Sequence, residues 1–145
     1  MVLPSTNHSQ FLSAVASGFV KRGGRKRSEA EFRLLLFKLK KNHRSRAYPL
    51  FDRGISNLLP KVRLRSKKKA GLVYRVPAPL RPGQALSFAT KWFRSAVKAR
   101  SGRSFGDRLF RELVDAAASR GEAYKKKAST HHTALLNRGF TKFLK

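Results

Sequence analysis

Two adjacent segments near the middle of the chain most limit how this sequence can fold. The first is strongly basic, and the second has the alternating pattern of a β-strand. Six cations lie between residues 61 and 69, and Leu72-Val73-Tyr74-Arg75-Val76 follows a short Ala70-Gly71 turn. Two such runs joined by a tight turn predict a two-stranded antiparallel ribbon over about residues 61–77. The dense positive charge near its tip suits contact with phosphate groups.

The charge of the whole chain points the same way. The 145 residues include 34 Lys and Arg against 7 Asp and Glu, a formal net charge of +27. Such a chain repels itself unless an anionic partner neutralises it, so we expect a polyanion as partner and a protein that works inside a complex. The hydrophobic fraction of 41% is enough for one modest core, which predicts a single domain over residues 1–145.

Helical periodicity dominates the rest of the sequence. Apolar residues recur at helical spacing in six segments, near residues 11–20, 28–41, 49–59, 85–97, 104–117 and from 129 onward. Ser28 with Glu31, and Ser104 with Asp107, predict capped starts, Pro49 is expected to open the third helix, and Trp92 is interpreted as a core residue. Residues 77–82 and 125–127 are expected to be connectors, and Gly121 to follow the fifth helix. We therefore predict a mainly α protein, a bundle of about six helices with one protruding two-stranded β-hairpin.

The first 28 residues have a second interpretation. They contain serines and cations but no acid, as mitochondrial transit peptides do. The helical spacing of Phe11, Val15 and Phe19 favours an amphipathic helix of the folded protein instead. The apolar run from Phe11 to Val20 is about half the length of a membrane span, so no membrane association is expected.

Catalytic chemistry finds little support in the sequence. Among the seven acids, Glu112 and Asp115 share a helical face, and we expect them to pair with nearby arginines, Arg108, Arg111 and Arg120. Adjacent His131 and His132 diverge by about 100° on a helix, which argues against a metal site. With no cysteine and no phosphate-loop pattern, the sequence predicts no enzyme, no metal and no cofactor.

Three basic clusters, residues 21–27, 61–69 and 125–127, are each expected in a turn or arm between buried helices. One charge run is usually a solvated surface, but three together with so few acids indicate phosphate binding. Tyr74, at the foot of the ribbon, could pack on the bundle or stack on a base, and packing is favoured.

The order of several motifs resembles small-subunit ribosomal protein seven, of the bacterial and organellar type. The similarity lies in Val62-Arg63-Leu64-Arg65-Ser66-Lys67-Lys68, Tyr74-Arg75-Val76-Pro77, Leu80-Arg81-Pro82 and Trp92. It continues through Ala99-Arg100, Arg108-Leu109, Glu112-Leu113, Asp115-Ala116-Ala117, Lys125-Lys126, His131, Asn137 and Phe140. The sequence departs from the family at Phe105-Gly106, Leu135-Leu136 and the end at Lys145.

This resemblance implies a protein of the small-subunit head that binds the 3′ major domain of the rRNA and helps nucleate head assembly. Its partners would be that rRNA, neighbouring head proteins, exit-site tRNA and mRNA, without a homo-oligomer. It assigns rRNA binding to Lys21, Arg22, Arg25, Lys26, Arg27, Lys61, Arg63, Arg81, Arg94, Lys98, Arg100, Arg103, Arg108, Lys125, Lys126, Lys127 and His131. It places Arg65, Lys67, Lys68, Lys69 and Arg75 near tRNA and mRNA.

Two other functions, DNA binding and RNA processing, were weighed against the sequence, and its departures from the family bear on the cellular compartment. An architectural DNA-binding protein also needs a basic β-arm, but residues 66–70 offer no apolar wedge. An RNA-processing enzyme would need metal-binding acids or a histidine pair arranged across the fold, and the sequence shows neither, since His131 and His132 are adjacent. The departures from the family, with no leader before the first helix, favour a mitochondrial ribosome, with an organelle-encoded gene as one option, over bacterial cytoplasm or plastid.

Overall fold

The computed structural model describes residues 25–102 and 104–143. In these ranges the chain forms helices and one antiparallel ribbon, so the predicted mainly α class with a β-hairpin is confirmed. The first expected helix, residues 11–20, lies outside the described residues. The elements in chain order are α2 (Arg25–His43), the 3-10 helix η1 (Arg44–Arg46), α3 (Ala47–Leu58), β1 (Val62–Lys69), β2 (Leu72–Pro79), α4 (Pro82–Ala99), α5 (Phe105–Ala117), α6 (Glu122–Leu136) and the 3-10 helix η2 (Arg138–Phe143).

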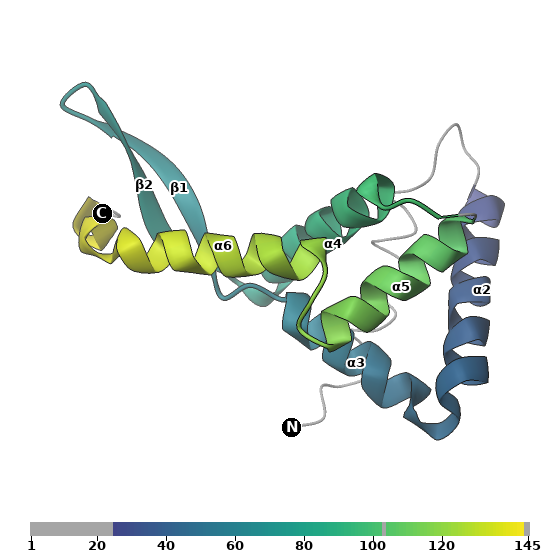
Figure 1. Ribbon diagram of the computed structural model, residues 1–145. Coiled ribbons are helices and arrows are strands. Elements are labelled where there is room, and N and C mark those ends of the chain that lie inside the picture. Colours follow the sequence, from purple (N-terminus) through teal and green to yellow (C-terminus); the bar gives the residue numbers. More distant parts are fainter. Residues whose placement is uncertain (1–24, 103, 144–145) are drawn as a thin grey trace.

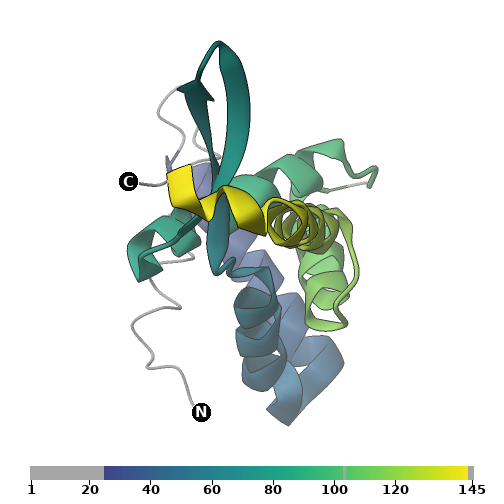
Figure 2. The ribbon, with the colours of Figure 1, turned by 90° about the vertical axis from the view of Figure 1, so that its left-hand side faces the viewer.

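The helices form a bundle from which the ribbon projects (Figures 1 and 2). Helix α5 contacts α2, α3, α4 and α6 and so holds the centre of the bundle. Helix α6 leaves the bundle toward the root of the ribbon, and η2 then packs on β2. The chain thus has two parts, a helical body and an arm made of β1, β2 and η2.

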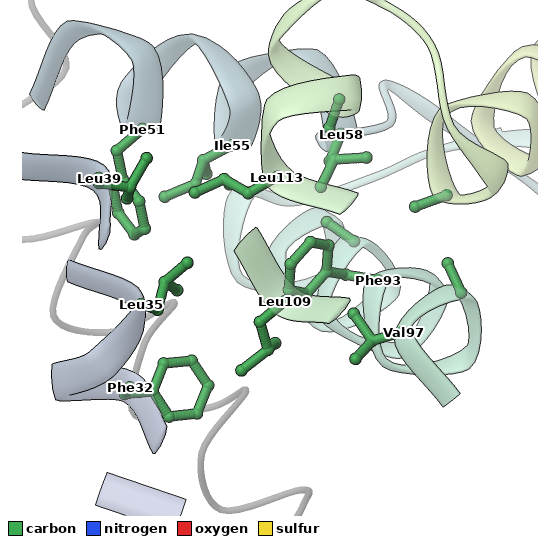
Figure 3. Close-up of a cluster of buried hydrophobic side chains, with 14 of the residues drawn as sticks. Phe32, Leu35, Leu39, Phe51, Ile55, Leu58, Phe93, Val97, Leu109 and Leu113 are labelled. Carbon is green, nitrogen blue, oxygen red and sulfur yellow. The ribbon is translucent and has the colours of Figure 1, made fainter. Parts of the chain in front are cut away.

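Buried aliphatic and aromatic side chains from α2, α3, α4 and α5 meet in one core (Figure 3). Phe93 is 1% exposed, and Leu109 and Leu58 are fully buried. Gly54 permits close approach of α3 to α5, because a Cβ there would lie 3.0 Å from Leu113 Cδ1. Trp92, interpreted as a core residue, is partly buried and packs against the edge of this core beside Phe88.

The ribbon is longer than predicted. Its register pairs Val62 with Pro79 and Lys69 with Leu72, so Pro77 and Pro79 belong to β2 rather than to a connector. Proline is tolerated in this strand because a two-stranded ribbon has only edge strands, each with one unpaired side. The predicted turn is confirmed at Ala70 and Gly71, whose φ angles of 50° and 78° are both positive, as in hairpin turns of type I′.

Several predicted helix starts and ends are wrong. Helix α2 already runs through Ser28, so the predicted capping box there does not form, and α3 begins at Ala47, two residues before Pro49. Helix α5 ends at Ala117 and α6 begins at Glu122, not at Ser129. The lysines at 125–127 therefore lie within α6 rather than in a connector. The predicted cap at Ser104 is confirmed, since its Oγ accepts from the backbone N–H of Asp107 at 3.1 Å.

Candidate nucleic-acid interface

The strand register of the ribbon decides which of its cations share a face. Side chains alternate along a strand, so Arg63, Arg65, Lys67 and Lys69 share one face with Tyr74 and Val76, which lie opposite them on β2. Lys68 and Arg75 belong to the other face. Arg65, Lys68, Lys69 and Arg75 are exposed, while Arg63 and Lys67 are half-buried. The arm therefore presents cations on both faces, with the denser row on the face of Tyr74.

The C-terminal segment η2 braces this denser face. The Tyr74 ring lies 5.2 Å from the rings of both Phe140 and Phe143, so Tyr74 packs, as favoured, but on η2 rather than on the bundle as predicted. Lys69 Nζ lies 4.5 Å from the centre of the Phe143 ring, a cation–π contact. Asn137 Nδ2 donates to the Arg75 carbonyl at 3.1 Å. Aromatic and polar contacts thus tie the ribbon to the end of the chain.

A second cationic surface follows α4 and reaches α6. An open groove of about 660 Å³ is lined by Gly83, Leu86, Ser87, Thr90, Lys91, Arg94, Ser95 and Lys98. Lys126 Nζ, from α6, donates to Ser95 Oγ at 2.7 Å and joins the groove's rim. We call this surface the α4 groove. Hydroxyls and cations in one open groove are the donors that an RNA backbone needs.

The three consecutive lysines of α6 point to different neighbours. Lys125 Nζ donates to Glu122 Oε1 at 2.8 Å, which raises the pKa of Lys125 and lowers that of Glu122. Lys126 reaches Ser95 as described, and Lys127 Nζ donates to the Asn57 carbonyl at 2.7 Å. The predicted basic cluster at 125–127 is therefore divided among three surroundings, because successive helical residues are about 100° apart.

Arg100 is an internal ion-pair partner in this structure. Its Nη2 donates to Glu112 Oε2 at 2.8 Å and to Asp115 Oδ2 at 2.5 Å. Burial opposes the charge of Arg100, but the hydrogen bond to Asp115 and the charges of Glu112 and Asp115 outweigh it and raise the pKa of Arg100. These acids were expected to pair with Arg108, Arg111 and Arg120. They pair instead with Arg100, which follows the end of α4.

The same network joins three helices. Glu112 is fully buried, and its Oε1 accepts from the backbone N–H of Ala123 at 3.0 Å. Gly121, with φ of 89°, brings α6 so close that a Cβ there would lie 2.9 Å from Glu112 Oε1. Glu112 thus connects α4, α5 and the start of α6.

The other residues predicted to bind rRNA lie in several parts of the fold. Arg25, Lys26 and Arg27 lie in α2 and not in a turn, and the side chain of Lys26 is exposed. Arg81 is exposed before α4, Lys98 is exposed, and the half-buried Arg108 lies 5.7 Å from the Phe105 ring. Lys21, Arg22 and Arg103 lie outside the described residues.

Sequence reasoning missed Lys91 and Lys142. Lys91 lines the α4 groove with Arg94 and Lys98, a spacing of three and then four residues that marks one helical face and could have been recognised. Lys142 Nζ lies 5.4 Å from the Phe143 ring, beside the ribbon. Its place depends on η2, a separate 3-10 helix where the sequence had predicted that the last helix continues.

Within residues 25–102 and 104–143, no His, Asp and Glu side chains form a group of three able to hold a metal ion. Among the described helices, none has the length and apolar composition of a membrane span.

The fold and these surfaces define a class, a strongly cationic helical protein with a basic β-arm suited to contact a polyanion. The family described as "Ribosomal protein S7p/S5e" matches residues 1–138 of this chain. The chain belongs to this family of ribosomal proteins, as the motif resemblance predicted, and is a structural constituent of the small ribosomal subunit.

Curated bacterial relatives of this chain are described as small ribosomal subunit proteins. The small ribosomal subunit protein uS7 of Acidithiobacillus ferrooxidans is 31% identical over 145 residues, covering 99% of this chain and 92% of the relative. The uS7 of Rhizorhabdus wittichii is 38% identical over 102 residues, 69% of this chain and 65% of the relative. That of Bordetella pertussis is 39% identical over 97 residues, 67% of this chain and 62% of the relative.

Proposed function

We propose that this protein binds the 3′ major domain of small-subunit rRNA and helps to nucleate folding of the subunit head. The observation that carries the proposal is the separation of charges. Lys38, Arg100 and Lys125 form ion pairs with acids, whereas Arg65, Lys68, Lys69 and Arg75 of the ribbon and Lys91 and Lys98 of the α4 groove are exposed and have no acids nearby in sequence. Residues 53–106 contain no Asp or Glu at all.

Binding would depend mainly on phosphates and shape. Base-paired RNA hides its base edges in a deep, narrow groove, so cations on separated surfaces recognise how its helices are arranged. The ribbon, the α4 groove and the start of α2 are three such surfaces. Together they would bridge RNA elements that are distant in the rRNA sequence, which is how a structural protein stabilises a folded domain.

The ribbon has a more specific role in this proposal. It projects beyond the bundle (Figure 1), and its tip at Lys67, Lys68 and Lys69 is free of core contacts. We place it near exit-site tRNA and the mRNA exit channel, as the family resemblance implies. Neighbouring head proteins are the remaining expected partners.

Charge reversal tests rRNA binding directly. Replacing Arg25, Lys26, Lys67 and Lys68 with Glu is expected to weaken affinity for the folded 3′ major domain at physiological salt by roughly tenfold or more. The matched control reverses Arg33, Lys40, Lys41 and Arg46, four exposed cations outside the proposed surfaces. Unchanged affinity in the first variant, or equal losses in both, would contradict the assignment.

One observation favours a second candidate function. Leu72 and Val73, next to the ribbon turn, are 62% and 66% exposed, so the tip is less purely cationic than the sequence had indicated. Apolar side chains at the end of a basic arm can wedge between base steps and bend a duplex. Bending of a doubly labelled DNA, measured by energy transfer, would support this function, and equal affinity for straight and distorted DNA would exclude it.

The compartment is also a proposal. We assign the protein to a mitochondrial ribosome because its sequence departs from the family pattern. Gly106 is one of these departures, and a Cβ there would lie 2.9 Å from Leu34 Cδ2. Subcellular fractionation with an antibody to the protein tests this. Recovery with cytoplasmic or plastid ribosomes would overturn it.

A further inference from the structure

Three serines of this chain have a cation both one and three residues before them. They are Ser28, Ser66 and Ser101. Protein kinases that act on basic substrates recognise such cations with carboxylates in the substrate groove, and arginine can pair with a carboxylate through two parallel hydrogen bonds. The groove takes an extended segment, so the fold decides which of the three serines a kinase can reach.

Ser66 is the one of the three that lies in an extended and exposed segment. It is an exposed residue of β1, and β1 has an unpaired edge because the sheet has only two strands. The ribbon projects from the bundle, so a kinase can approach it from solvent (Figure 1). Arg65 is exposed and Arg63 half-buried, and neither forms an ion pair within the described residues. Both cations are therefore left for the carboxylates of a partner.

The other two serines are placed differently. Ser28 and the cations before it lie in the first turn of α2, which is helical rather than extended. Ser101 follows directly after α4, and its preceding cation, Arg100, is held by two carboxylates of α5. A kinase would have to unwind α2 to use Ser28, or break two ion pairs to use Ser101. The structure therefore selects Ser66 from three serines that the charge pattern does not distinguish.

The ribbon also provides cations for the phosphate that a kinase would add. Ser66 lies directly opposite Arg75 in the strand register, and Lys68 shares their face two residues further along β1. Opposite residues in a ribbon have Cβ atoms about 5 Å apart, within reach of an arginine side chain. Arg75 and Lys68 are exposed, and η2 packs on the other face, that of Tyr74. A phosphate on Ser66 would thus meet a guanidinium and an ammonium on the open face of the ribbon.

We propose that Ser66 is a phosphorylation site for a protein kinase with an acidic substrate groove, and that its phosphate is bound by Arg75 and Lys68. The kinase transfers the γ-phosphoryl group of ATP to Ser66 Oγ, so an O–P bond forms there while the bond to the β-phosphate oxygen breaks. ADP leaves, and the hydroxyl proton passes to the catalytic base of the kinase. Charge-assisted hydrogen bonds from Arg75 and Lys68 then hold the phosphate on the ribbon.

Phosphorylation would change the charge of the open face of the ribbon. A phosphoserine carries a charge of about −1.5 to −2 at neutral pH, whereas residues 53–106 contain no acid. The phosphate would occupy Arg75 and Lys68 and would repel the backbone of a nucleic acid. Phosphorylation would therefore weaken RNA binding by the arm. The inference rests on the proposed function for this regulatory consequence, but not for the site itself.

Phosphorylation of the full chain by a purified kinase tests the site. The probe is the catalytic fragment of protein kinase C with ATP, and peptide mapping by mass spectrometry follows Ser28, Ser66 and Ser101 over time. In the folded chain Ser66 should be modified about tenfold faster than either of the others. Equal rates, or no modification of Ser66, would overturn the site.

Short synthetic peptides around the three serines are the control for the role of the fold. They carry the same charge pattern without α2, the ribbon or the ion pairs of Arg100. The preference for Ser66 should therefore disappear in the peptides. A preference of the same size in the peptides would contradict the selection of Ser66 by the structure.

The binding of the phosphate to Arg75 is tested by phosphorus NMR. A phosphoserine has a second pKa of about 6, and cations beside it favour the dianion and lower that pKa. The phosphate of the folded chain should have a pKa about half a unit lower than that of the chain unfolded in urea. Arg75→Gln should remove most of this decrease, whereas Lys69→Gln, which removes an exposed cation of the opposite face, should keep it. Equal pKa values in the two variants would contradict the proposed partner.

Binding to the folded 3′ major domain separates this inference from the proposed function. If the unmodified chain binds and phosphorylation weakens binding by about fivefold, both stand. If both forms bind equally, the regulatory consequence fails while the proposed function stands. If the unmodified chain does not bind although Ser66 is phosphorylated, the proposed function fails and the site stands. A Ser66→Ala chain treated with the kinase and ATP is the control, and its affinity should not change.

Discussion

The helical bundle and the arm are stabilised in different ways. In the bundle, side chains such as Phe93, Leu109 and Leu113 are at most 1% exposed and come from segments far apart in the sequence. In the arm, the described contacts are a two-stranded ladder, the packing of the Tyr74 ring on the rings of Phe140 and Phe143, and a few hydrogen bonds. The bundle therefore supplies the stability, and the arm supplies exposed charge.

The acidic residues show the same division. Glu31, Asp107, Glu112 and Asp115 all bond to groups within the bundle, and Glu112 does so while fully buried. Neither residues 53–106 nor residues 123–145 contain an acid. Since carboxylates near the arm would neutralise its cations, their absence there leaves the charge of the arm available to a polyanion.

The strongest test of this division is to remove one aromatic ring from each part. Phe93→Ala is expected to lower the free energy of unfolding by about 3–5 kcal/mol, because it leaves a cavity in the core. Phe140→Ala, in the half-buried arm, should change it by less than about 1 kcal/mol. Urea unfolding followed by circular dichroism measures both, and similar losses would contradict the division.

The ion-pair network within the bundle gives the next largest effect. Arg100→Ala is expected to destabilise the bundle by about 3 kcal/mol, because it leaves the buried Glu112 carboxylate without its cation. The slope of rRNA affinity against salt should not change, since the guanidinium of Arg100, expected from the family resemblance to bind rRNA, is already paired with Glu112 and Asp115. Arg111→Ala, on the exposed side of α5, is the control. A reduced salt slope in Arg100→Ala would return this residue to the binding surface.

Shortening the ribbon tests the arm on its own. Deleting Lys68–Lys69 and Leu72–Val73, two paired residues from each strand, keeps the turn, Tyr74 and the root. Folding and much of the rRNA affinity should survive, with unfolding free energy within about 1 kcal/mol of the parent, because the tip adds little to the core. Contacts to exit-site tRNA or mRNA, measured by crosslinking on reconstituted subunits, should fall. Collapse of the bundle would count against the account.

The pH dependence of stability sharpens the comparison at the root of the arm. The His131 pKa is lowered from 6.5, so as the pH falls the unfolded chain takes up this proton first. The contribution of His131 should be complete above about pH 6.5 and should be lost as the pH falls toward the folded-state pKa. His131→Gln should flatten that part of the stability curve, and His132→Gln should not. An identical curve for the parent and His131→Gln would refute the assignment.

The smallest expected effect is at the turn. Ala70 has φ of 50°, which strains a residue with a Cβ, whereas asparagine tolerates this conformation better. Ala70→Asn should stabilise the ribbon by about 0.5 kcal/mol and slow amide exchange in β1 and β2 without affecting the bundle. Slower exchange in α5 as well would mean that the two parts are not separate.

Much of this architecture could be predicted because local sequence patterns determine it. The spacing of Ala85, Ala89, Phe93 and Val97 predicted α4, and Ala70-Gly71 between two extended runs predicted the ribbon turn. Those signals depend on neighbours within a few residues. The start of α6 was missed because Lys125-Lys126-Lys127 resembles a solvated connector, although each lysine has a separate partner.

The interface was harder to predict because it depends on contacts between distant residues. Nothing local distinguishes Arg100, which pairs with Glu112 and Asp115, from Lys98, which stays exposed. The hydrogen bond from Lys61 to His131 joins residues 70 apart. Charge counting identifies the polyanion as partner but does not separate cations used within the fold from those left for RNA.

The most direct test of the central claim is competition binding of the purified chain across a salt series. The competitors are the folded 3′ major domain of small-subunit rRNA, generic duplex RNA, and linear and bent DNA. The account predicts a preference for the rRNA domain of roughly a hundredfold or more that persists as salt rises, since the separated cationic surfaces recognise shape beyond counterion release. Equal affinities with one steep salt slope would contradict it and leave only a nonspecific polycation.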